Sequence, residues 1–240
     1  MSFQDVVDEH FPGTMPEADF VQQSYHALEG YGFSGTNAIA SVGVCRDEIN
    51  RSLANLVEDR WGQPFDMSSL AGMLWLGKTG FSAAQHHSPI VEGRERYVYY
   101  AMPHIAIGPC GTIGLCHRRG RAEPSSACGA LVGFQKELQS GDLSVRTDPY
   151  DIEQSLLKQS LFRKIRYGDV PDLVTLTQFT HEIILEDLEK MIELTLDPAK
   201  SDYDYAVFTG IQINGPDHVN YVWPSTSYAV VNEVRHEIEW

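Results

Sequence analysis

Two cysteines and a histidine fall where a folded chain would bring them together. Cys45 ends an apolar, strand-like run, His104 follows a proline in an aromatic and β-branched run, and Cys128 lies near the start of an expected helix. In α/β sheets, ligands bind beyond the carboxyl ends of the strands, where loops and helix N-termini converge. Two thiolates and one imidazole suit zinc, and three protein ligands leave its fourth position open. The residue types therefore predict an open, catalytic kind of zinc site at these three positions.

Asp47 lies two residues after Cys45 and is the expected catalytic carboxylate. A zinc ion with an open position lowers the pKa of bound water from about 15.7 to roughly 7. Asp47 is expected to accept a hydrogen bond from that water and to orient it. The carboxylate needs a cation to keep it off the metal, and Arg46 and Arg51 are the near candidates. We expect Arg46 to hold Asp47 through a charge-assisted pair.

Two other classes of function remain open for the same residues. If Asp47 itself closes the fourth position, the protein is a non-catalytic zinc scaffold or a bicarbonate-sensing protein. If Cys45 is a nucleophile activated by a histidine, the protein is a cysteine enzyme, although no separate oxyanion-hole motif is visible. Metal content separates the nucleophile from the two zinc proteins, and turnover separates an enzyme from a scaffold.

Further histidines, cysteines and arginines offer weaker alternatives. His86 and His87 suit either a proton shuttle, because histidine titrates near pH 6.5, or a pair that braces a loop. Cys110 and Cys116 are expected to be buried small hydrophobic residues rather than metal ligands. The basic run His117–Arg121 would attract bicarbonate or another anion, or pair with acids across a subunit interface.

The composition is that of a globular chain with a strong negative charge. The 240 residues carry a formal net charge of −15, which argues against nucleic acid or a membrane surface as a partner, since both favour a basic face. No stretch approaches the roughly 18 apolar residues of a membrane span, and the acidic N-terminus lacks the features of a secretory signal. We therefore expect a cytoplasmic protein, in which the four cysteines favour metal binding or catalysis over disulfides.

Hydrophobic periodicity and turn residues predict the elements that position these side chains. We expect helices at 16–30, 47–62, from Ser125 or Ser126 to about 140, 150–167 and 172–196, and strands at 38–45, 94–108 (interrupted before His104), 204–213, 219–223 and 227–240. Strands and helices alternate in the first 140 residues. This alternation predicts an α/β fold, with a sheet covered by helices on both faces, and we expect a single zinc-binding domain over residues 1–240.

Two short blocks, VCRDE and SSACGAL, resemble the motifs of β-carbonic anhydrases. Those motifs are Cys-x-Asp-x-Arg at the end of a strand and His-x-x-Cys-Gly-Gly at the start of a helix. Cys45 and Asp47 match the first motif, and Cys128 matches the second. Ile49 and Ser125 depart from them, because they stand where the motifs have an arginine and a histidine.

The departures, together with the blocks SVGVCRDEINR, GKTGFSAAQHHSP and GRERYVYYAMPHIAIG, make the chain similar to the low-carbon-dioxide-inducible B/C family. Some members of that family are called θ-type carbonic anhydrases. The resemblance covers most of residues 30–135. It implies a β-carbonic-anhydrase-like fold, a homodimer with zinc in each subunit, and a zinc histidine from a different strand, which His104 supplies. The implied reaction is the reversible hydration of carbon dioxide to bicarbonate, although the family includes both active and inactive members.

Overall fold

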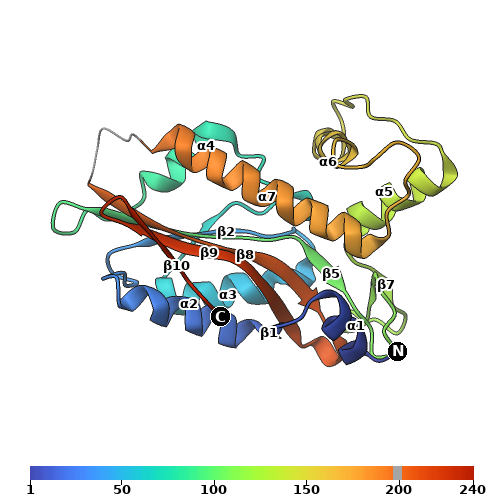
Figure 1. The fold of residues 1–240 in the computed structure, drawn as a ribbon, viewed down its shortest axis with the longest axis horizontal. Coiled ribbons are helices and arrows are strands. Elements are labelled where there is room, and N and C mark those ends of the chain that lie inside the picture. The colour runs from blue at the N-terminus through green and yellow to red at the C-terminus, as the bar shows by residue number, and fades with distance from the viewer. Residues whose placement is uncertain (197–201) are drawn as a thin grey trace.

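The computed structural model describes residues 1–196 and 202–240, which form a large mixed sheet with helices on both sides (Figure 1). The helices are α1 (Phe3–His10), α2 (Glu17–Glu29), α3 (Arg51–Trp61), α4 (Gly77–Gln85), α5 (Gly129–Ser140), α6 (Ile152–Phe162) and α7 (Leu173–Thr195). The strands are β1 (Met15–Pro16), β2 (Ile39–Gly43), β3 (Phe65–Asp66), β4 (Glu95–Ala101), β5 (His104–Ala106), β6 (Leu115–Cys116), β7 (Ser125–Ser126), β8 (Tyr203–Asn214), β9 (Asn220–Val231) and β10 (Val234–Glu237). Short 3-10 turns cover Glu48–Asn50, Leu70–Gly72 and Pro216–His218.

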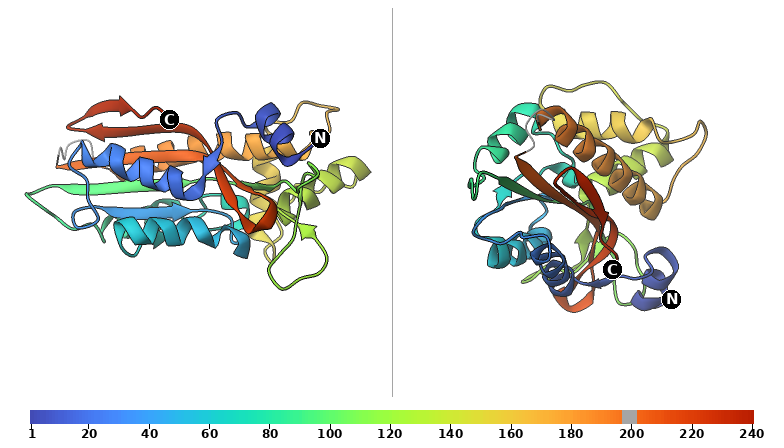
Figure 2. Two further views of the ribbon diagram at one scale, coloured as in Figure 1. Left: turned by 90° about the horizontal axis from the view of Figure 1, so that it is seen from below. Right: turned by 60° about the vertical axis from the view of Figure 1, so that its left-hand side comes forward.

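Parallel strands form the centre of the large sheet, whose order is β1-β9-β8-β4-β2-β3. Strand β2 pairs in parallel with β3 and β4, and both β4 and β5 pair in parallel with β8. Strand β9 is antiparallel to β8, β1 and β10 (Figure 2). Because parallel strands end at the same edge of a sheet, the loops that follow β2 and β4 lie near each other there.

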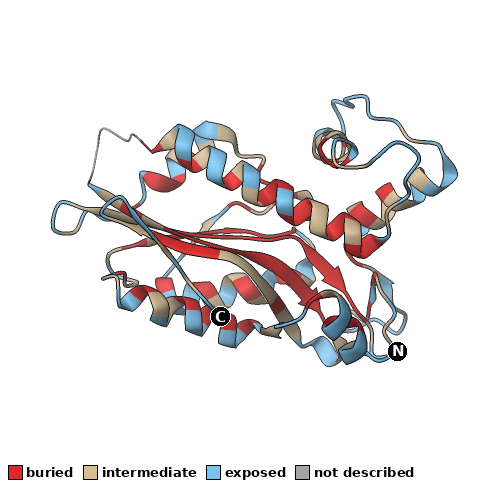
Figure 3. Ribbon diagram, in the orientation of Figure 1, coloured by how far each residue is buried: buried red, intermediate tan, exposed pale blue. Residues whose placement is uncertain are grey.

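The two faces of the sheet have separate hydrophobic cores. Tyr97 and Tyr99 of β4 pack in the cluster that includes α4 and α7, whereas Val98 and Tyr100 pack in the cluster of α2 and α3. This alternation follows from the two-residue period of a strand. Figure 3 shows the buried residues along the sheet and on the inward sides of the helices. The expected fold class, an α/β sheet covered by helices on both faces, is confirmed.

Strands β4 and β5 lie on one line that is interrupted at Pro103, as the sequence predicts. Ala101 pairs with Thr209 and His104 pairs with Gln212, so the two pieces keep the same register on β8. Proline has no N–H to donate to a neighbouring strand. The interruption therefore leaves His104 as the first residue of a short strand just past the carboxyl end of β4.

The predicted helices are found with one error of position. The helix expected from Ser125 or Ser126 begins only at Gly129, with Cys128 as its N-cap residue. The two serines instead form β7 and pair with β6, so they are not available as helix caps. Within the described residues, no helix is long and apolar enough to cross a membrane.

Candidate metal centre

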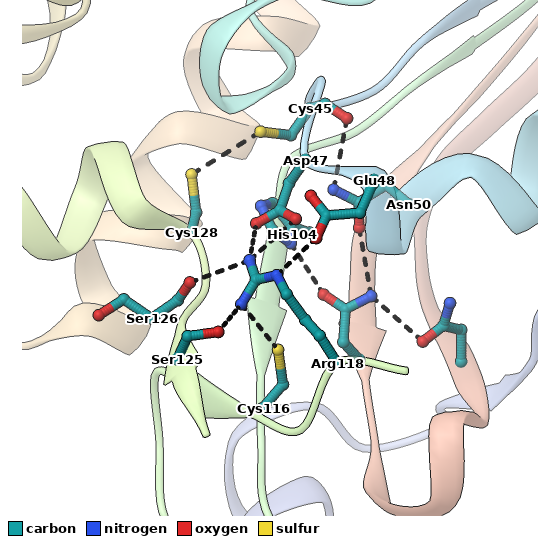
Figure 4. Close-up of polar contacts among 12 residues, drawn as sticks. Cys45, Asp47, Glu48, Asn50, His104, Cys116, Arg118, Ser125, Ser126 and Cys128 are labelled. Atoms are coloured by element: carbon teal, nitrogen blue, oxygen red, sulfur yellow. Dashed lines mark hydrogen bonds and ion pairs between the residues drawn. The ribbon is translucent and has the colours of Figure 1, made fainter. Parts of the chain in front are cut away.

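The three expected ligands come from three separate elements and meet beyond one edge of the sheet. Cys45 follows β2, His104 begins β5, and Cys128 immediately precedes α5. All three are buried, with 6%, 1% and 2% of their surface exposed. One ligand atom from each residue lies within 4.8 Å of the other two. The structure thus brings the predicted group together (Figure 4).

The geometry and the donor set of this group fit a zinc ion. The two Sγ atoms are 3.9 Å apart, close to the about 3.8 Å expected for two thiolates at Zn–S distances of about 2.3 Å in a tetrahedral site. His104 Nε2 is buried and has no hydrogen-bond partner within the described chain. An unpartnered buried nitrogen costs free energy, and a metal ion between the thiols would satisfy it.

Hydrogen bonds within the group distribute its protons unevenly. The hydrogen bond from Cys128 is the largest influence on Cys45 and lowers the pKa of that thiol to about 4. The same bond raises the pKa of Cys128 well above its ordinary value. Burial lowers the pKa of His104, but the nearby Cys45 thiolate outweighs it and the net shift is upward. Because a metal needs deprotonated ligands, metal binding here must release protons.

Asn214 holds the His104 ring in a defined orientation. His104 Nδ1 lies 2.8 Å from Asn214 Oδ1, and an amide oxygen can only accept, so Nδ1 carries the proton. The lone pair of Nε2 is then directed at the two thiols. Metal-ligating histidines commonly have such a partner. No local motif marks Asn214, which lies at the end of β8, and the sequence reasoning did not find it.

Arg118, not Arg46, holds Asp47, so the expected pairing was wrong. Nη2 of Arg118 lies 3.0 and 2.7 Å from the two carboxylate oxygens of Asp47. Arg46 reaches in another direction and makes two hydrogen bonds to Glu153. Arg51 makes no ion pair with Asp47 within the described chain. A side chain one residue away must fold back to reach Asp47, whereas Arg118 approaches directly from the loop after β6 (Figure 4).

Further contacts fix the Arg118 guanidinium in place. Its Nε donates to Glu48 at 2.7 Å, its Nη2 donates to the Ser126 carbonyl at 3.2 Å, and its Nη1 contacts Ser125 Oγ. The side chain is only 17% exposed. Ser125, which stands where the β-type motif has its histidine, therefore supports Arg118 instead of contacting the metal group.

Asp47 lies beside the metal-binding group but is not part of it. Burial raises the pKa of the Asp47 carboxyl, against the opposing influence of His104 and Arg118. Within the described residues, the compact group contains two thiols and one imidazole and does not include Asp47. The carboxylate thus lies next to the group while its charge is directed at the Arg118 guanidinium.

The other residues singled out in the sequence lie outside this group. His86 and His87 are exposed at the end of α4, where His86 contacts the Ser82 carbonyl. Cys116 is buried, as expected, but Cys110 is exposed, so that expectation was wrong. Cys110 occupies the turn closed by the Gly111 to Gly108 hydrogen bond, which keeps it at the surface.

A buried carboxylate, which the sequence reasoning missed, lies on the α2 side of the site. Glu17 is 4% exposed and accepts hydrogen bonds from Ser52 Oγ, at 2.6 Å, and from Gln212 Nε2. Burial raises the pKa of Glu17 from 4.5 to about 7. Glu17 lies in the first turn of α2, where an acid is ordinarily explained by the helix dipole alone, so its sequence position does not distinguish it.

This carboxyl should make the stability of the metal-free protein depend on pH. The folded state binds the Glu17 proton more tightly than the unfolded chain does, so its contribution is complete below pH about 4.5 and is lost as the pH rises through about 7. Glu17→Gln stays neutral throughout, and its amide can donate to Gln212 Oε1, which lacks a partner. Relative to the wild type, we expect the variant to gain up to about 3 kcal/mol at pH 8 and little at pH 5. Urea unfolding at the two pH values measures the difference, and equal differences would contradict it.

Comparisons with known proteins agree with this architecture. The family described as limiting CO2-inducible proteins B/C β-carbonic anhydrases matches residues 14–231. The crystal structure of limiting CO2-inducible protein LCIB is 36% identical, covers 96% of each chain and superposes with a TM-score of 0.80. The structure of PtLCIB4, a homologue of LCIB, is 24% identical over 98% of each chain, with a TM-score of 0.83, and shows likeness of fold. Among curated proteins, no sequence matches the chain.

Proposed function

The chain belongs to the limiting CO2-inducible protein B/C family of β-carbonic anhydrases, and we propose that it is a zinc-dependent carbonic anhydrase. Its reaction would be the reversible hydration of carbon dioxide to bicarbonate and a proton. Cys45, His104 and Cys128 would hold the zinc ion. The main support for this proposal is the buried Nε2 of His104, which has no hydrogen-bond partner and lies beside the Sγ atoms of Cys45 and Cys128, 3.9 Å apart.

The surroundings of Asp47 favour an enzyme over a closed-site scaffold. Zinc with an open position supplies a nucleophile at neutral pH by lowering the pKa of bound water. Arg118 holds both oxygens of Asp47, which opposes the turn of that carboxylate towards the ligand group. Asp47 can then accept a hydrogen bond from the attacking group and fix its orientation, while Asn214 keeps the proton of His104 on Nδ1.

Three further properties are part of the proposal. The family resemblance supports a homodimer with zinc in each subunit, with carbon dioxide and bicarbonate as its small-molecule partners. We also propose that the protein is cytoplasmic, and its acidic composition argues against nucleic acid and membrane surfaces as partners. The continuous large sheet supports a single zinc-binding domain over the chain.

Hydration of carbon dioxide should rise as the pH increases from roughly 7 to 8.5. Two thiolates would donate negative charge to the metal. The water at its open position should therefore ionise somewhat above the pH of about 7 typical of sites with three neutral imidazoles. Stopped-flow hydration on zinc-loaded protein measures this profile. Asp47→Ala should lower the rate far more than it lowers the zinc content.

Two results would argue against this function. A flat, uncatalysed rate across the whole pH range with zinc fully bound would leave a non-catalytic zinc protein. Activity that survives both zinc removal and Asp47→Ala would require a different catalyst, of which Cys45 as a nucleophile is the first to test.

A further inference from the structure

A chain of hydrogen bonds joins the buried carboxylate of Glu17 to the imidazole of His104. His104 Nδ1 bonds to Asn214 Oδ1 at 2.8 Å, and Asn214 Nδ2 donates to Asn220 Oδ1 at 3.2 Å. Asn220 Nδ2 donates to Ser52 Oγ at 2.9 Å, and Ser52 Oγ donates to Glu17 Oε2 at 2.6 Å. The five side chains come from β5, β8, β9, α3 and α2, and none of them is fully exposed.

An ionised Glu17 favours one and the same direction for every bond in this chain. An ionised carboxylate only accepts hydrogen bonds, so the Ser52 hydroxyl must donate to Glu17 and accept from Asn220. Each amide along the path then presents its NH2 group towards Glu17 and its oxygen towards His104. The last acceptor, Asn214 Oδ1, requires a proton on Nδ1 of His104 and therefore leaves Nε2 free.

We propose that Glu17 is a positioning residue for the metal centre, whose negative charge, relayed through Ser52, Asn220 and Asn214, keeps His104 in the metal-binding tautomer and strengthens Nε2 as a donor. This inference rests on the proposed zinc site. Glu17 does not touch the metal or the substrate. The relay acts on the metal only through the His104 ring. Hydrogen-bond partners of a ligating histidine fix the orientation of its ring and raise its basicity.

The environment of Glu17 supports a role that depends on its charge. Helix α2 packs on α3, β1, β8 and β9, and the side chains of these elements that bond to the carboxyl are Ser52 of α3 and Gln212 of β8. Neither is charged or titratable, and no ion pair reaches Glu17 within the described residues. A buried carboxylate without a cation is costly, and a neutral glutamine would fill the same space.

Two backbone carbonyls should limit the loss of zinc affinity in Glu17→Gln. Asn214 Nδ2 also donates to Asn50 Oδ1 at 3.2 Å, and Asn50 Nδ2 in turn donates to the Cys45 carbonyl. Asn220 Nδ2 also donates to the Ile49 carbonyl. These acceptors help to orient the amides even when Glu17 is neutral. We therefore expect Glu17→Gln to weaken zinc binding at pH 8 by roughly three- to tenfold, less than the roughly 10- to 100-fold typical of a residue that touches the ligand directly.

The test combines zinc affinity with the resonance of the His104 Nδ1 proton. Zinc affinity is measured by chelator competition at pH 6 and pH 8, and the proton by NMR across the same range. In the wild type the resonance should shift as Glu17 titrates, and in Glu17→Gln this shift should be absent. Ser52→Ala, which interrupts the relay but keeps the carboxylate, should weaken zinc binding like Glu17→Gln. Glu29→Gln removes an exposed charge from the same helix and should behave as the wild type.

The stability measurement separates this role from a purely structural one. Glu17→Gln should be more stable than the wild type at pH 8 and yet bind zinc more weakly. A folded Glu17→Gln or Ser52→Ala protein with unchanged zinc affinity and an unchanged His104 resonance would overturn the proposal. If the wild type binds no zinc, the proposed function fails, while the His104 resonance of the metal-free protein still tests the relay.

Discussion

Replacement of any one of the three ligands should remove nearly all zinc and all carbon dioxide hydration. We expect Cys45→Ser, His104→Ala and Cys128→Ser to fall from about one zinc ion per chain to almost none, because an open site has only three protein ligands. Loss of a residue that merely orients a ligand already costs roughly 10- to 100-fold in affinity, so loss of the ligand itself should cost more. Metal analysis of the purified variants measures the effect.

The remaining two cysteines provide matched controls for this experiment. Cys110 is exposed, and Cys116 is buried beside Arg118 but outside the ligand group. Cys110→Ser and Cys116→Ser should both keep their zinc. Full retention in Cys128→Ser together with loss in Cys116→Ser would show that the metal uses a different thiol.

Removal of Arg118 should abolish most of the activity while leaving zinc in place. Arg118→Met takes away the cation that holds Asp47, and a freed carboxylate oxygen is itself a zinc ligand. We expect a rate loss of roughly 100-fold, the size associated with a misplacement of about 1 Å in an active site. The partly buried Asp47 carboxylate, left without its cation, should also lower the free energy of unfolding by about 1–3 kcal/mol. Stopped-flow hydration, metal analysis and urea unfolding measure the three quantities.

Arg46→Met is the control for Arg118→Met, because it removes the same charge from the residue next to Asp47. Arg46 pairs with Glu153 and its side chain is 62% exposed, and exposed pairs contribute about 0–1 kcal/mol. This variant should not lower the hydration rate. A large loss in Arg46→Met with none in Arg118→Met would restore the pairing expected from the sequence.

The metal group could be found from the sequence, whereas the residue that holds Asp47 could not. Cys45 ends a predicted strand, His104 follows the interruption of another, and Cys128 lies near the start of a predicted helix. The fold class brings such positions to one edge of the sheet, and the family resemblance singled out these three residues. The partner of Asp47 lies 71 residues away in a hairpin, and only the basic run His117–Arg121 in an acidic chain hinted at it.

The buried polar contacts show a second limit of sequence reasoning. Glu17, Asn50 and Asn214 have no spacing that distinguishes them from surface residues, and their roles depend on how α2, α3 and β8 pack together. A similar limit explains the misplaced start of α5. Ser125 and Ser126 are good helix caps by residue type, but both form strand β7 and pair with β6.

The separation of the three ligands along the chain has a consequence for every measurement of stability. An unfolded chain does not keep the end of β2, the start of β5 and the N-terminus of α5 together, so the zinc ion proposed here would bind the folded protein alone. Mass action then adds about 4 kcal/mol to folding when the free metal is a thousand times its dissociation constant. The melting temperature would therefore report the free zinc concentration, and variants can be ranked only in a metal buffer.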